Sequence, residues 1–283
     1  MIETSVEAAA RDRTEVIRQA IKWTVYSLLL LNWTYYMFDD WRVAQHTVLP
    51  GAPLTDWMQA FATTLDELAW FTLLFLFEAE TYWLSDDAMT RLKRALFVLL
   101  RIACYGFLAH TVYAYVMNFV ELRDATLIAA SGVCELADQG ISFLRNLEYT
   151  DITSANCATL SAGGPLYQIE GPHVITDAAG LSEATFLGVV DIEDALVWLA
   201  VVVIIELVVI MQERGISEGP AISIANFLTM ALYAVLICNA LYWAWKGHWV
   251  YAWDELLWIG GFAAIEMNLS EWRDEMSEEA VRA

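Results

Sequence analysis

Six long apolar stretches restrict the folds that this chain can adopt. They cover roughly residues 19–37, 58–83, 94–120, 191–212, 221–246 and 250–270. Each approaches the roughly 20 apolar residues needed to cross a hydrocarbon core of about 30 Å. Because an unpaired backbone amide is costly in lipid, each stretch should be a helix, and the alternating polarity of membrane-barrel strands is absent. The sequence therefore predicts an all-α integral membrane protein with six transmembrane helices.

The basic residues predict how these helices are oriented. Short cytoplasmic loops are enriched in Lys and Arg. Basic residues precede the first stretch, separate the second from the third and follow the fourth: Arg11, Arg13, Arg18, Lys22, Arg91, Lys93, Arg94 and Arg214. Six alternating helices place all of them on one side, so we expect both termini in the cytoplasm. The mixed-charge first residues do not resemble a cleavable signal peptide, so the first helix should remain in the mature protein.

The longest gap between apolar stretches divides the chain into three parts. Residues 1–120 hold three helices and the cytoplasmic N-terminus, residues 121–190 form an external cap, and residues 191–283 hold three helices and the cytoplasmic C-terminus. Apolar residues at loosely helical spacing between Asp124 and Leu147 predict that the third helix continues or restarts in the cap. The rest of the cap should be irregular.

Two cysteines of the cap, Cys134 and Cys157, are candidates for a disulfide. An external compartment permits such a bond, and it would stabilise a segment with little apolar surface. We therefore expect a bridge between them, with two free thiols as the alternative.

A repeated pattern links the second, fourth and sixth stretches. Each carries Asp, Leu, Trp and Glu at the same spacing: Asp66, Leu68, Trp70 and Glu78; Asp194, Leu196, Trp198 and Glu206; Asp254, Leu256, Trp258 and Glu266. The odd stretches carry a polar residue three positions before a tyrosine: Asn32 and Tyr35, His110 and Tyr113, Asn239 and Tyr242. These patterns indicate three tandem helical hairpins. Parallel repeats are related by an axis along the membrane normal, so we expect pseudo-threefold symmetry.

The repeated acids are the candidate functional residues. At about 100° and 1.5 Å per residue, each Asp shares a broad face with its Trp and Glu and lies about 18 Å from that Glu. Two carboxylate layers are therefore expected. A charge within the bilayer costs at least about 2–3 kcal/mol and usually marks an ion or proton route. Two structural alternatives stay open: the aspartates could complement helix dipoles, and the glutamates could pair with Arg101.

This pattern predicts a cation channel or transporter. Glu78, Glu206 and Glu266 would form the inner coordinating or proton-exchanging layer, Asp66, Asp194 and Asp254 the outer layer, and Asn32, His110 and Asn239 the route between hairpins. Carboxylate oxygens suit hard cations, so a bound cation is the cofactor to expect, without any particular metal being indicated. The alternative for His110 is a hydrogen-bonded core histidine.

The main alternative function is a non-catalytic membrane scaffold or accessory subunit that binds a partner through its external cap. An enzyme is the least expected class, because phosphate-binding, zinc-protease and nucleophile-elbow motifs are missing from the sequence. The net charge of −21 argues against nucleic acid as a partner. The partners that remain are the lipid bilayer, a cation, and either further copies of the chain or a partner subunit.

Overall fold

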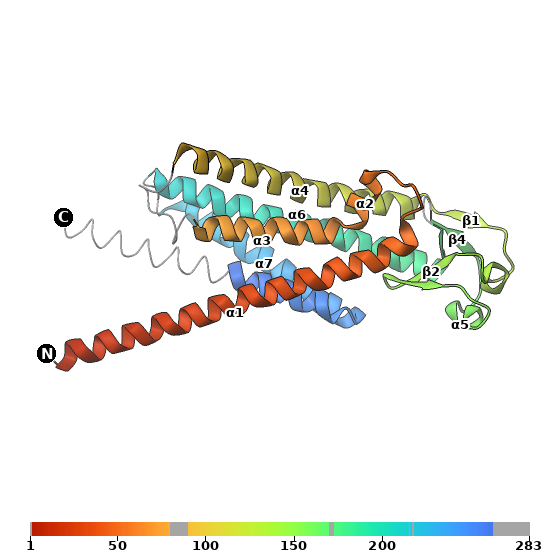
Figure 1. The fold of residues 1–283 in the computed structure, drawn as a ribbon, viewed down its shortest axis with the longest axis horizontal. Coiled ribbons are helices and arrows are strands. Elements are labelled where there is room, and N and C mark those ends of the chain that lie inside the picture. Colours follow the sequence, from red (N-terminus) through yellow and green to blue (C-terminus); the bar gives the residue numbers. More distant parts are fainter. Residues whose placement is uncertain (1, 80–89, 170–172, 215, 217, 263–283) are drawn as a thin grey trace. The chain divides into compact units, whose positions relative to one another are not determined.

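The computed structural model describes residues 2–79, 90–169, 173–214, 216 and 218–262 (Figure 1). These residues are mostly helical, and a small five-stranded sheet is inserted between helices α4 and α6. The chain divides into two compact units. One comprises residues 35–200, and the other comprises the residues up to 34 together with those from 201 onward. Each unit is treated by itself.

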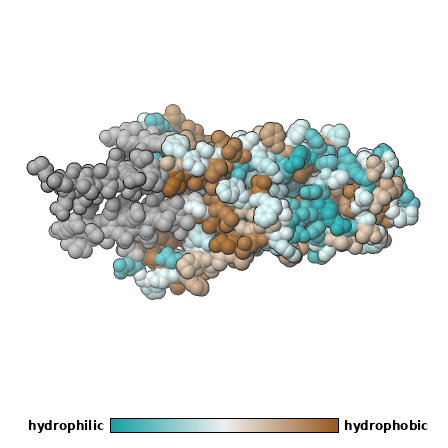
Figure 2. Space-filling view, turned by 90° about the horizontal axis from the view of Figure 1, so that it is seen from below, coloured by the Kyte–Doolittle hydropathy of each residue, from teal (hydrophilic) through white to brown (hydrophobic). Residues whose placement is uncertain are grey.

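Three helices are long and apolar enough to cross a bilayer: α4 (Arg91–Arg123), α6 (Ala178–Glu213) and α7 (Pro220–Lys246). Large apolar side chains are exposed on their surfaces, for example Leu99, Val203 and Phe227. The face in Figure 2 shows hydrophobic residues over the helical part and hydrophilic residues gathered near the sheet. Lipid is the solvent that suits such helices, so the chain is a multi-pass membrane protein.

Two further helices contain the first predicted stretch and the start of the sixth. The first stretch lies within α1 (Ile2–Thr47), which continues ten residues beyond the predicted end at residue 37. The sixth stretch begins in a helix over residues 249–262, where the described part of the chain ends. Gly247 separates this helix from α7 and has a left-handed φ of 89°, which glycine adopts without strain.

The second predicted stretch is not one straight helix. It consists of α2 (Leu54–Ala60) and α3 (Ala62–Glu78), which meet at Phe61 with a bend of 72° and together form a fourth candidate span. Phe61 has no side-chain acceptor for the first amides of α3. Asp40 of α1 supplies the missing acceptor. Its Oδ2 accepts hydrogen bonds from the N–H and the hydroxyl of Thr64, at 2.8 and 2.7 Å. The prediction of an uninterrupted helix over residues 58–83 was therefore wrong at Phe61, and residues 80–83 lie outside the described residues.

Residues 126–177 form a separate β-sheet region, which we name the β-domain. Its strands are β1 (Thr126–Ile128), β2 (Ser142–Arg145), β3 (Glu148–Asp151), β4 (Leu166–Gln168) and β5 (Val174–Asp177). The strand order is β1-β4-β5-β2-β3, in which β2 and β5 are parallel and the other neighbours are antiparallel. Asn146 and Leu147 join β2 to β3 with positive φ at both residues, as a type I′ hairpin turn requires.

The expectations of an all-α fold and of a cap that starts as a helix and continues irregularly were wrong, because the cap contains a five-stranded sheet. The residues between Asp124 and Leu147 form β1, a short 3₁₀ helix η3 (Val133–Leu136) and β2. The apolar pair Phe143 and Leu144 explains the error, because both residues are buried, one on each face of the sheet. A strand that is buried on both faces has no alternation of polarity, so its apolar residues can imitate one side of a helix.

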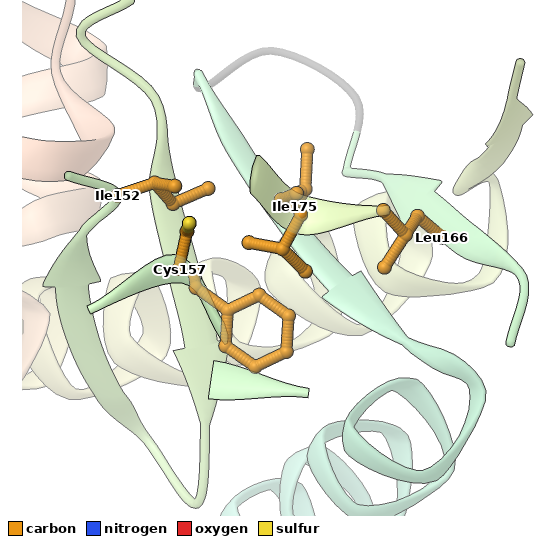
Figure 3. Packing of buried hydrophobic residues seen from close by; sticks show 6 residues of the cluster. Ile152, Cys157, Leu166 and Ile175 are labelled. Carbon is orange, nitrogen blue, oxygen red and sulfur yellow. The ribbon is translucent and has the colours of Figure 1, made fainter. Parts of the chain in front are cut away.

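One face of the sheet carries the core of the β-domain. Phe143, Ile152, Leu166 and Ile175 pack there with η3 and with α5 (Cys157–Leu160), as Figure 3 shows for the central residues. The predicted disulfide between Cys134 and Cys157 is confirmed and joins η3 to α5. It therefore holds the two short helical segments over the core.

The other face of the sheet packs against the ends of two apolar helices. Leu144 and Val174 are buried with Ala184 of α6, and Leu122 of α4 packs against them. Gly180 permits this approach, because a Cβ at this position would lie 2.2 Å from Thr176 Oγ1 and 3.1 Å from Leu144 O. The β-domain is thus fixed to the helix ends by an apolar contact.

Candidate functional site

The three copies of the repeated motif present the same faces. The tryptophans Trp70, Trp198 and Trp258 are buried, with 7–8% of their surface exposed, whereas the leucines two positions earlier are 39–50% exposed. Asp254 is buried, and Asp66 and Asp194 are half-buried. Each motif therefore points its Asp–Trp side inward and its Leu outward, as one shared structural unit would.

Two copies of the motif meet within the unit of residues 35–200. The rings of Trp70 on α3 and Trp198 on α6 lie 6.3 Å apart between centroids, with their planes tilted by 58°. The indole N–H of Trp70 donates a hydrogen bond of 3.1 Å to Asp66 Oδ2 in the preceding turn. The sequence pattern thus identified residues of α3 and α6 that face each other.

An acidic cluster surrounds Tyr115 of α4 in the same unit. The Tyr115 hydroxyl lies 3.5 Å from Thr63 Oγ1 and within electrostatic range of the carboxylates of Asp66, Asp191 and Asp40. The charged neighbour of Asp191 is Asp194, one helical turn further along α6. Three helices, α1, α3 and α6, therefore carry acidic side chains within electrostatic range of the Tyr115 hydroxyl on α4.

Three members of this cluster were not among the predicted site residues. Asp40, Tyr115 and Asp191 lie outside the repeated motif, because α1 and α4 carry no copy of it and Asp191 precedes its copy in α6. The spacing of Asp191 and Asp194 was the available signal, since residues three apart share a helix face. Nothing in the sequence around Asp40 or Tyr115 indicates that they approach these acids.

The third motif copy lies in the other unit, and its Asp254 has a hydrogen-bond partner within that unit. Asn32 Nδ2 of α1 donates a hydrogen bond of 2.7 Å to Asp254 Oδ1. Both side chains are buried, and so is Asn239 on α7. Asn32, which was predicted to line the route between hairpins, is therefore in contact with Asp254, which was predicted for the outer layer.

His110 of α4 is the residue that occupies the position of these asparagines in the second hairpin. It is half-buried, and its Nε2 is buried without a hydrogen-bond partner among the described residues. Its ring lies 6.1 Å from that of Tyr113, which is exposed.

The two described members of the predicted glutamate layer have different environments. Glu78 is buried at the end of α3, whereas Glu206 is exposed on α6. Glu266 lies outside the described residues. Convergence of the three glutamates stays a prediction.

A Ser–His–Asp group connects α1 to the β-domain. His46 Nδ1 lies 2.8 Å from Ser142 Oγ and 3.2 Å from Asp151 Oδ1, and the Ser142 hydroxyl donates to the same Asp151 oxygen at 3.0 Å. In a hydrolase triad, serine and aspartate contact different nitrogens of the histidine, and the serine must reach substrate. Here both use Nδ1, and Ser142 is 3% exposed. This geometry suits attachment of the sheet to α1 and does not fit nucleophilic catalysis.

Tyr149 completes that attachment. Its ring stacks on His46 at 5.9 Å with an interplanar angle of 11°. Burial raises the pKa of Tyr149 to about 12, and the charge of Glu121 adds to the effect. The phenol is therefore uncharged throughout the physiological pH range.

Together, the fold and these side chains define a multi-pass membrane protein with a disulfide-bonded β-domain and an acidic cluster among its helices. Within the part of the chain that the structure describes, no group of three or more His, Cys, Asp or Glu side chains is arranged to hold a metal ion. No protein family model, no curated protein and no solved structure matches the chain.

Proposed function

We propose that the chain moves a cation across the membrane, as a channel or a transporter, with the acidic cluster around Tyr115 as a cation-attracting position on its route. The observation that supports this proposal is the convergence of Asp40, Asp66 and Asp191 on Tyr115 from separate helices. The fold alone is compatible with many functions, so the proposed cation transport depends on this cluster.

The chemistry of the cluster suits a cation. A carboxylate within a membrane-spanning segment costs at least about 2–3 kcal/mol, and such residues usually face a cavity or mark an ion pathway. Several acids in one place concentrate cations and repel anions. The hydroxyl groups of Tyr115 and Thr63 lie 3.5 Å apart, and that of Tyr115 is within electrostatic range of the acids. Both hydroxyls can donate hydrogen bonds to a proton carrier or a hydrated ion, or accept them from it.

The finer architecture that we propose is three helical hairpins with six spans and both termini in the cytoplasm. The shared pattern of a buried Trp and an exposed Leu in the three motif copies supports a common unit. In this arrangement the Asp layer lies near the leaflet on the side of the β-domain, and Glu78, Glu206 and Glu266 form the inner layer near the cytoplasmic leaflet. Asn32, His110 and Asn239 then line the route between hairpins.

One observation favours the scaffold alternative. The sheet ends in two edge strands, β1 and β3, and Leu127 on β1 is 66% exposed. An edge strand offers backbone groups to which a partner strand can add. In that function the acids would serve only to hold the helices together.

Cation flux into proteoliposomes distinguishes the two functions. The double variant Asp66→Asn with Asp191→Asn removes two charges from the cluster and keeps the size of both side chains. Asp138→Asn is the matched control, because Asp138 is exposed and has a φ of 59°, which Asn adopts readily.

We expect the double variant to lose most of the flux of protons or Na⁺ and the control to retain it. Elution of both proteins as the wild-type species in size-exclusion chromatography excludes misfolding as the cause. Unchanged flux in the double variant contradicts the route. No flux in the wild-type protein, together with recovery of a partner bound through the β-domain, supports the scaffold instead.

A further inference from the structure

The short helix α2 has two chemically different sides. At about 100° per residue, Leu54, Trp57, Met58 and Phe61 fall within a stripe of about 100°. Thr55, Asp56 and Gln59 occupy the opposite side. α2 has no buried residue, although it connects directly to α3, with which it forms one bent candidate span. A helix this apolar on one side needs an environment other than the protein core.

The polar side of α2 is fixed to the end of α4. Gln59 Nε2 donates hydrogen bonds to Asn118 Oδ1 at 2.7 Å and to Glu121 Oε1 at 3.1 Å. Both acceptors lie in the last two turns of α4, shortly before β1 begins at Thr126. α2 therefore lies at the level where α4 ends and the β-domain starts.

The apolar side of α2 is exposed and aromatic. Leu54 is 74% exposed, and Trp57 stacks on Trp41 of α1 with ring centroids 6.2 Å apart. Trp41 is itself 50% exposed. Tryptophan is enriched where the headgroups meet the hydrocarbon, because its ring is apolar and its N–H is polar.

We propose that α2 is an interfacial helix that lies in the bilayer surface on the side of the β-domain, with Leu54, Trp57 and Trp41 inserted at the boundary between headgroups and acyl chains. The bilayer is the expected occupant because α2 and α3 together form a candidate span, so lipid is expected beside them. A helix bent by 72° from a spanning helix also lies near the membrane plane. The apolar side of α2, which is not hydrogen-bonded to α4, then contacts lipid.

Spin labels on the two sides of α2 test this placement in the full-length protein. The free cysteines are first replaced, as Cys104→Ala and Cys238→Ala, and the disulfide is kept. A nitroxide is then attached at Leu54→Cys or, as the matched control, at Asp56→Cys. Both positions are exposed, so a label displaces no packed side chain. Collision with oxygen, which dissolves in lipid, and with a water-soluble nickel chelate is measured in phosphatidylcholine liposomes.

We expect the label at residue 54 to collide several-fold more with oxygen than with the nickel chelate, and the label at residue 56 to show the reverse. Equal access of the nickel chelate to both labels would place α2 in water and overturn the proposal. A label at residue 54 that neither reagent reaches would also overturn it, since another protein surface, such as a second copy of the chain, would then cover this side.

Discussion

Asp40 belongs to α1 but completes the first turn of α3. Its carboxylate accepts hydrogen bonds from the N–H and hydroxyl of Thr64, and it is 8% exposed. The amides at the start of a helix have no partner within the helix, so their acceptor must come from elsewhere. At the bend after Phe61 this acceptor comes from a different helix.

We expect Asp40→Ala to destabilise the protein by about 1–3 kcal/mol, because a buried amide and a buried hydroxyl lose their acceptor. Asp40→Asn should cost less, since an amide oxygen can still accept. Unfolding in detergent micelles by titration with SDS measures both variants. Asp39→Ala is the control, because its ion pair with the exposed Arg42 contributes at most about 1 kcal/mol. Equal losses for Asp39→Ala and Asp40→Ala would contradict this function of Asp40.

Asp177 is a carboxylate of the β-domain whose pKa is lowered in the folded state. Burial by itself would raise the pKa of Asp177, but hydrogen bonds from the Gly180 N–H and the Ser161 hydroxyl and the charge of Arg145 hold it below its ordinary value. These bonds measure 2.8 Å from Gly180, 2.8 Å from Ser161 and 2.7 Å from Arg145. The folded state therefore favours the carboxylate.

A lowered pKa in the folded state gives stability that is fully present above the ordinary pKa of about 3.9 and is lost as the pH falls through the folded value. We expect protection of the β2 and β3 amides from hydrogen exchange to decrease below about pH 4. Asp177→Asn keeps an acceptor for Gly180 but cannot titrate, so its exchange should depend less on pH in this range. An unchanged pH dependence in this variant, after correction for intrinsic exchange, would assign the acid sensitivity to other groups.

At the level of elements, the disulfide is the main covalent constraint on the β-domain. It joins cysteines 23 positions apart, and a loop of this length corresponds to about 3 kcal/mol from restriction of the unfolded chain. We expect the double variant Cys134→Ala with Cys157→Ala to open the β-domain. Trypsin would then cleave after Arg145 in β2 under conditions in which the wild-type protein resists.

Cys238→Ala is the control for this experiment, because Cys238 is an exposed free thiol of α7. It should leave the cleavage at Arg145 unchanged. Resistance to trypsin in the double variant would show that the apolar core of Phe143 and Ile175 is sufficient without the bond.

The apolar helices could be predicted from the sequence to within a few residues at several of their ends. α4 and α7 begin and end close to the predicted boundaries. Lipid requires apolar side chains and internally paired backbone groups in every turn of a spanning helix, so the limits of such a helix are visible in the sequence. α6 begins 13 residues before the predicted residue 191, since its first turns pack against the sheet and need not be uniformly apolar. The disulfide was predictable because both cysteines fall in one segment that the sequence predicts to be external.

The bend at Phe61 and the sheet could not be predicted. Phe61 is no helix breaker, and its conformation depends on the acceptor that Asp40 supplies from 24 positions earlier. The hairpin turn has Leu147 where glycine is usual, so the strongest local signal of a type I′ turn is missing. In both places a contact distant in sequence determines the local structure.

The acidic cluster was predictable only in part. The repeat identified Asp66 and Asp194 because both belong to the same helix face as a buried Trp. Asp40 and Tyr115 come from helices that carry no copy of that motif, and only packing brings them near these acids. A sequence pattern shows which face of a helix is polar, whereas it does not show which other helix supplies the neighbour.

At the level of the whole molecule, the three-hairpin proposal requires both termini on one side of the membrane and the β-domain on the other. We expect epitope tags at the two termini to be inaccessible in intact cells. A cysteine introduced as Asp138→Cys should react there with a membrane-impermeant maleimide, because residue 138 is exposed in the β-domain. Termini on opposite sides would require an odd number of spans and would contradict the hairpins.

The order of synthesis determines when the carboxylate that caps α3 becomes available. Asp40 is translated 24 residues before Thr64, so α1 leaves the ribosome before α3 does. The carboxylate of Asp40 has thus already been synthesised when α3 enters the lipid. The amides in the first turn of α3 can therefore form their hydrogen bond as soon as they leave water. A chain that lacks α1 would have to recruit water at this point, and a separately expressed α1 fragment could restore what the truncation removed.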